Sequence, residues 1–76
     1  MSGAAIVTRA VNAAPKDEPW ELEVITVSSG CIRGTYVTHN GGMGFLELDV
    51  LERGKTERSR CYVSLQPVVA CFVRVD

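Results

Sequence analysis

The chain has 76 residues, of which eight are basic and nine are acidic, so its formal net charge is −1. A domain of this size buries only about 60% of the surface that its unfolded chain exposes, and oligomerisation is one way to stabilise so small a core. The balanced charge does not indicate a polyanionic partner, and no apolar run approaches the roughly 20 residues that span a bilayer. The sequence therefore predicts one cytoplasmic domain, residues 1–76, that does not contact a membrane.

Residues 4–11 are compatible with both a helix and a strand. Ile6 and Ala10 have helical i, i+4 spacing, whereas Ile6, Val7 and Val11 are β-branched, as is typical of strands. Because no capping box precedes this segment, the pattern favours a strand. Two prolines and three charges in residues 12–19 then predict a loop, so residues 1–19 form an N-terminal segment and linker.

The first strand of the main domain begins at Trp20. Apolar and polar residues alternate as far as Val24, but Ile25 and Val27 then place apolar side chains on the opposite face. Such a change of phase predicts a bulge or bend, where a strand passes from one half of a sheet to the other. Ser28-Ser29-Gly30 predicts the turn that follows.

Residues 31–38 predict the second strand, with Gly34 in its middle. A glycine inside a strand indicates a sharp bend or a close approach of another backbone, and we favour this over a contact with a ligand. The loop of residues 39–44 contains three glycines. It does not match a nucleotide-binding phosphate loop, because no helix follows it.

Three further strands are predicted at residues 45–52, 57–65 and 68–75. In the fourth strand Cys61, Val63 and Leu65 form an apolar face, and the opposite face is basic and aromatic. Pro67 separates the fourth strand from the fifth, because proline cannot donate to a sheet ladder. The fifth strand is apolar on both faces, so we expect it to be covered by the core on one side and by another subunit on the other.

The three cysteines, Cys31, Cys61 and Cys71, all fall inside predicted strands. Three thiols cannot all pair, which indicates a reducing compartment rather than a disulfide framework. There is no Cys-x-x-Cys spacing, and His39 is the only histidine. We therefore expect no metal site and no cofactor.

Together these patterns predict a mainly β fold. It is a small, five-stranded, strongly bent SH3-like or Sm-like barrel over residues 20–75, preceded by a short strand or helix. The segment Val24-x-x-Val27-x-x-Gly30 with Gly34 and His39-Asn40 resembles the first motif of the Sm-like family. Residues 61–69 are similar to that family's fourth strand, tight turn and fifth strand.

The resemblance implies that subunits join the fourth strand of one to the fifth strand of the next and close into a ring. The interface would then include Val68, Ala70 and Phe72. It also implies that single-stranded RNA would be held at the ring pore by His39, Asn40 and residues 64–66.

One local feature favours a polyanion, because half of the basic residues fall in a single hairpin. Arg53, Lys55, Arg58 and Arg60 lie there with Tyr62, on which a base could stack. The alternative is a solvated turn that protects a sheet edge from aggregation. The candidate nucleic-acid-binding residues are His39, Asn40, Arg53, Lys55, Arg58, Arg60 and Tyr62.

An enzyme is the least supported class of function, because no carboxylate is obviously placed to act with His39, and the cysteines resemble small apolar core residues. Two hypotheses remain. The first is a small, non-enzymatic, oligomeric β-barrel that acts as a binding or assembly module, with itself or another protein as partner. The second is an Sm-like ring that binds single-stranded RNA. The near-neutral charge favours the first.

Overall fold

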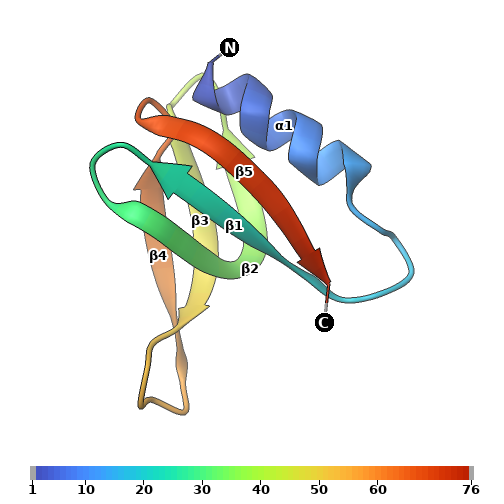
Figure 1. The fold of residues 1–76 in the computed structure, drawn as a ribbon, viewed down its shortest axis with the longest axis vertical. Coiled ribbons are helices and arrows are strands. Elements are labelled where there is room, and N and C mark those ends of the chain that lie inside the picture. The colour runs from blue at the N-terminus through green and yellow to red at the C-terminus, as the bar shows by residue number, and fades with distance from the viewer. Residues whose placement is uncertain (1, 76) are drawn as a thin grey trace.

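The computed structural model describes residues 2–75. One helix is followed by five strands: α1 (Gly3–Ala13), β1 (Trp20–Thr26), β2 (Gly30–Asn40), β3 (Phe45–Leu51), β4 (Arg58–Ser64) and β5 (Val68–Val75). All neighbouring strands are antiparallel, and they form one sheet in the order β4-β3-β2-β1-β5. Figure 1 shows α1 alongside β5, with β4 and the β3–β4 turn on the other side of the sheet. The prediction of a mainly β fold with five strands is confirmed.

Residues 3–13 form a helix, so the prediction that favoured a strand there was wrong. Ser2 is the N-cap, and its Oγ accepts a hydrogen bond from the Ala5 N–H at 3.2 Å. Alanine has a high helix propensity, and Val7 on the inner face of α1 is fully buried. Tertiary packing and a simple serine cap therefore outweigh the β-branched residues in this segment.

Gly34 lies at a bend where β2 changes its pairing partner. The first part of β2, up to Gly34, pairs with β1, and the part from Thr35 onwards pairs with β3. A Cβ on Gly34 would lie 2.6 Å from the Asp49 carbonyl oxygen and 2.9 Å from Val50 Cγ2. The predicted bend and close backbone approach at this glycine are confirmed.

The predicted irregularity in the first strand is also present. The register between β1 and β5 shifts between Ile25 and Thr26, as expected of a bulge. Thr26 then supports the turn, because its Oγ1 accepts a hydrogen bond from the Ser29 N–H at 2.8 Å. Gly30 has a φ of 72°, which glycine adopts without strain.

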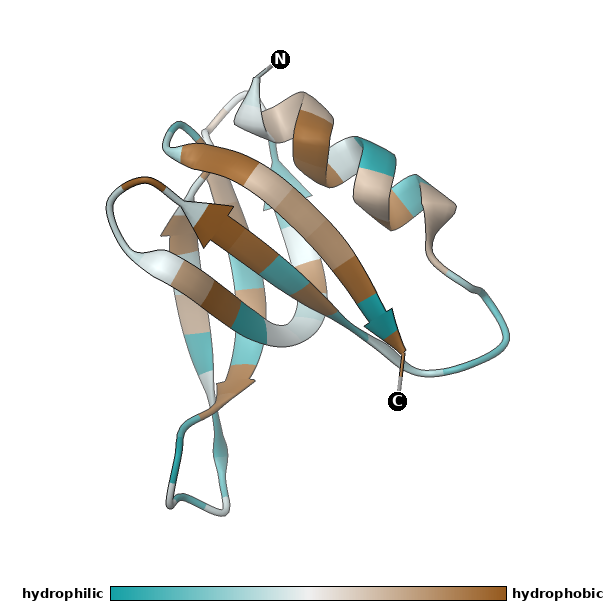
Figure 2. Ribbon diagram, viewed as in Figure 1, coloured by the Kyte–Doolittle hydropathy of each residue, from teal (hydrophilic) through white to brown (hydrophobic). Residues whose placement is uncertain are grey.

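The core lies between the bent sheet and α1. Its buried residues come from the helix, from β1, β3 and β4, and from the junction between β4 and β5. They are Val7, Leu22, Val24, Leu46, Leu48, Val63, Leu65 and Val68. In Figure 2 the α1–β1 connection and the β3–β4 turn are mostly hydrophilic in colour, whereas hydrophilic and hydrophobic bands follow one another along α1 and the strands.

The fifth strand receives part of its cover from the chain itself. Cys71 and Val73 pack against the core, and Ala10 of α1 lines a shallow cleft together with Ala70 and Cys71. The helix therefore supplies some of the cover that the sequence assigned to another subunit.

Candidate functional site

Carboxylates form ion pairs with most of the basic side chains of the β3–β4 hairpin. Arg60 Nε lies 2.7 Å from Asp49 Oδ1, and Arg60 Nη1 lies 3.1 Å from Glu47 Oε2. The hydrogen bond to Asp49 is the main cause of a raised pKa for Arg60. Lys55 Nζ lies 3.0 Å from Glu52 Oε2. Two of the four predicted cations therefore have acidic partners on the same hairpin.

Arg58 is held by three groups at the start of β4. Its Nη1 donates to Thr35 Oγ1 at 3.0 Å and to the Asp49 backbone carbonyl at 3.2 Å. It also lies 3.6 Å from Glu21 Oε2. Glu21 in turn pairs with Arg33, whose Nε lies 3.0 Å from Glu21 Oε1. One guanidinium nitrogen of Arg58, Nη1, thus makes all three contacts, toward β1, β2 and β3, and the side chain is 45% exposed.

Two of the predicted nucleic-acid contacts, Arg53 and Tyr62, are exposed and have side chains that form no ion pair or hydrogen bond within residues 2–75. Arg53 is exposed in the β3–β4 turn, and within residues 2–75 it forms no ion pair. Tyr62 is 66% exposed, and its ring centroid lies 6.4 Å from that of Phe45 at a tilt of 58°. One free cation and one exposed ring on β4 and its turn make a small surface for RNA.

The side chains of His39 and Asn40 are engaged within the chain. His39 Nδ1 lies 2.7 Å from Tyr36 Oη, and its Nε2 lies 2.9 Å from Thr8 Oγ1, so the ring connects β2 to α1. Asn40 Oδ1 accepts a hydrogen bond from the Met43 N–H at 2.9 Å and so caps the loop after β2. A base at this position would have to displace these bonds.

The two loops that the resemblance assigned to RNA do lie side by side. Leu65 donates its N–H to the Gly44 carbonyl at 2.9 Å, which joins the β2–β3 loop to the β4–β5 junction. A cleft of about 200 Å³ lies here, lined by Ser2, Gly3, Ala4, Gly41, Gly44, Leu65 and Gln66. Its lining contains no cationic side chain.

The edges of the sheet form a second candidate surface. β4 and β5 are each paired on one side only within the described chain. Of the three predicted interface residues, Val68 is buried in the core, Ala70 is half-buried and Phe72 is 44% exposed. Arg74 lies over the Phe72 ring, with its Cζ 5.1 Å from the ring centroid. β5 also exposes other apolar side chains, Val69 and Val75.

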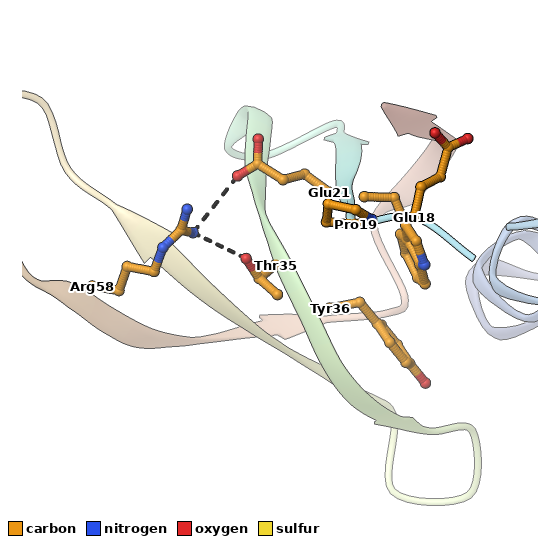
Figure 3. A pocket seen from close by; sticks show the side chains of 7 residues that line it. Glu18, Pro19, Glu21, Thr35, Tyr36 and Arg58 are labelled. Atoms are coloured by element: carbon orange, nitrogen blue, oxygen red, sulfur yellow. Dashed lines mark hydrogen bonds and ion pairs between the residues drawn. The ribbon is translucent and has the colours of Figure 1, made fainter. Parts of the chain in front are cut away.

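The third candidate is an aromatic cleft of about 360 Å³ between the starts of β1 and β4 and the bend in β2. The rings of Trp20 and Tyr36 stack in it, with centroids 5.7 Å apart and planes 19° apart. Figure 3 shows Arg58 and Thr35 at one end of this cleft and Glu18 at the other. The size is within the range of small-ligand sites, about 300–1,000 Å³.

Two of the three thiols, those of Cys31 and Cys71, have raised pKa values. A hydrogen bond from Cys31 Sγ to Glu23 Oε2, 3.1 Å long, is the main cause of a raised pKa for Cys31. Burial raises the pKa of Cys71 to about 11. Because the thiolate is the reactive form, both groups are poor nucleophiles at neutral pH.

Within residues 2–75 no group of His, Cys, Asp and Glu side chains has the arrangement of a metal site. In the same residues, no helix has the length and apolar character needed to cross a membrane. Comparison with protein-family models, with curated proteins and with solved structures finds no match to this chain. The surfaces themselves are therefore the basis for a functional proposal.

Sequence reasoning did not identify the aromatic cleft. Its residues come from the linker, β1, β2 and β4, and they meet only because β2 bends at Gly34. One signal was available, because Trp20 is the only tryptophan and carboxylates flank it at Glu18 and Glu21.

Proposed function

We propose that this chain is a non-enzymatic assembly module, an SH3-like or Sm-like barrel that forms a homo-oligomer by joining β4 of one copy to β5 of the next. The observation that supports this most is the strand order, which leaves two antiparallel edges at opposite ends of one bent sheet. The two edge strands are similar in length, with seven and eight residues. An unpaired edge invites pairing with another chain, and a closed assembly leaves none exposed.

The character of the two edge strands fits a partner of the same sequence. β5 presents the apolar surface of Val69, Phe72 and Val75, and β4 presents the exposed ring of Tyr62. A continued sheet would bury these side chains and so add to a small core.

The test is the absolute mass in solution, by native mass spectrometry or by light scattering after size exclusion. We expect an assembly of several copies for the natural sequence. Changing Val69→Lys together with Phe72→Lys should give a monomer, because charge on an edge strand opposes pairing. Met43→Lys is the matched control, because Met43 is 76% exposed but lies in the β2–β3 loop.

Circular dichroism must show that the double variant keeps its β structure, so that loss of assembly is separated from loss of folding. A natural chain that is monomeric at all working concentrations would refute the proposal.

Single-stranded RNA remains the second candidate, supported by the adjacency of the β2–β3 loop and the β4–β5 junction. Binding of A- or U-rich strands that weakens with salt and is lost in Arg58→Ala with Arg60→Ala would favour it. Since both arginines are held by groups of the same chain, we expect this binding to be weak or absent.

A further inference from the structure

The aromatic cleft carries an inference that does not depend on self-assembly. Its central feature is the stacked pair of Trp20 and Tyr36, whose rings come from the start of β1 and from β2 just after the bend. Trp20 also lines a neighbouring cleft of about 540 Å³, formed with the end of α1 and the linker. Glu18 lines both clefts. Trp20 and Glu18 therefore both border surfaces that a ligand can reach.

The charges in the cleft differ in how far they are already satisfied. The Arg58 guanidinium donates to Thr35 Oγ1 and the Asp49 carbonyl and faces the Glu21 carboxylate. Glu21 is shared with Arg33. Within residues 2–75 only Nη1 of Arg58 makes these contacts, and Glu21 is the carboxylate partner of two guanidinium groups.

Glu18 is different. Its residue is exposed, and within residues 2–75 it forms no ion pair and no side-chain hydrogen bond. In Figure 3 it lies at the end of the cleft away from Arg58. The lining of the cleft therefore holds two carboxylates and one guanidinium group, and the carboxylate without a partner in the described chain belongs to Glu18, two residues before Trp20.

An aromatic face beside a free carboxylate is the chemistry that recognises an organic cation. The ring quadrupole attracts a cation that is weakly hydrated, and tryptophan does so best. We propose that this cleft binds an organic cation, an alkylammonium or guanidinium group that lies against Trp20 and pairs with Glu18. The neighbouring cleft contains Lys16, and the cleft with Tyr36 contains Arg58, which lies at the end away from Glu18 (Figure 3).

Trp20 is the only tryptophan, so its fluorescence reports on this cleft and on the neighbouring cleft that it also lines. We would titrate the natural chain with tetramethylammonium chloride and with the amide of N-acetylarginine, against sodium chloride at equal ionic strength. The proposal expects a saturable change in emission with at least one of the two organic cations, with a Kd on the order of 1 mM or weaker. The two titrations distinguish a quaternary ammonium from a basic side chain.

Glu18→Gln should weaken this binding by about 3-fold, the effect of losing one exposed ion pair. Glu57→Gln is the matched control, because this substitution removes the same charge. Glu57 is exposed and lines none of the clefts described here. A response equal to that of sodium chloride would overturn the proposal. So would an equal loss in both variants, or saturable binding of sodium benzoate in place of the cations.

Discussion

Gly34 lies so close to Asp49 that a single added carbon would collide with the neighbouring strand. A Cβ at Gly34 would be 2.6 Å from the Asp49 carbonyl oxygen, which belongs to the backbone and cannot rotate away. We expect Gly34→Ala to lower the free energy of unfolding by about 1–3 kcal/mol. Urea denaturation would measure this change. Gly42→Ala is the control, because its Cβ would lie 3.4 Å from the side chain of Asn40, and its effect should stay within about 0.5 kcal/mol.

Gly3→Ala tests how α1 is seated on the sheet. Alanine normally stabilises a helix by up to about 1 kcal/mol relative to glycine. Here a Cβ would lie 1.8 Å from the Leu65 carbonyl oxygen, so the helix would have to move away from the β4–β5 junction. We therefore expect a net loss of stability in thermal unfolding. Asn12→Ala, at an exposed position of the same helix, should be neutral or slightly stabilising, and a stabilising Gly3→Ala would contradict this contact.

Tyr36→Phe should show how much the hydroxyl group of this residue contributes to stability apart from its ring. The variant keeps the stack on Trp20 but loses the bond between Tyr36 Oη and His39 Nδ1, which is 2.7 Å long. We expect a cost of about 1 kcal/mol. Because His39 is the only histidine, its ring nitrogen shifts in NMR would report the change directly. Unchanged shifts would show that the bond does not form in solution.

The raised pKa of the Cys71 thiol should make the free energy of unfolding fall at alkaline pH. Burial raises the pKa of its thiol from the ordinary value of 9.0 to about 11. Below pH 9.0 the thiol is protonated in the folded and the unfolded chain, so its full contribution to stability is present. As pH rises from 9.0 through about 11, the unfolded chain loses the proton first, and the free energy of unfolding falls.

Cys71→Ala should therefore give a shallower alkaline decline in urea denaturation at a series of pH values. Some decline should remain, because burial also raises the pKa of Tyr36. An alkaline decline as steep as that of the natural chain would contradict the burial of this thiol.

Glu23 should control the reactivity of Cys31. The hydrogen bond from the Cys31 thiol holds the pKa of Glu23 down and that of Cys31 up. In Glu23→Gln the thiol loses a negative neighbour, so its thiolate fraction rises and iodoacetamide should alkylate it faster at mildly alkaline pH. Peptide mapping would follow Cys31 separately from the other thiols. Glu47→Gln, which removes a carboxylate of β3, should leave the Cys31 rate unchanged.

Much of the fold could be predicted from local patterns. The five strands follow from the period-two alternation, and the bend in β2 follows from Gly34, because a glycine in a strand has few other roles. The helix was missed because residues 4–11 satisfy both periods. The close packing of Gly3 against Leu65 favours the helix, and it is a contact between segments far apart in the sequence.

The candidate surfaces were harder to predict, because their charges are compensated across strands. The basic hairpin has the composition of a polyanion site, but Arg58 meets Glu21 of β1, and Arg60 meets two carboxylates of β3. Only the strand order and register place these groups together. The composition gives the number of cations but could not show that three of the four pair with carboxylates.

The pairing of β1 with β5 also determines when the chain can finish folding. Glu21 lies opposite Arg74, and Leu22 lies opposite Val73, so a strand near the start of the sheet completes its ladder only with the last strand. Closing so long a loop is slow compared with forming a hairpin between neighbouring strands. Until β5 joins the sheet, β1 can have strand hydrogen bonds on one side only, and its apolar residues lack their partner. An unpaired strand edge and uncovered apolar side chains can pair with other chains, so the risk of aggregation should be greatest before β5 joins.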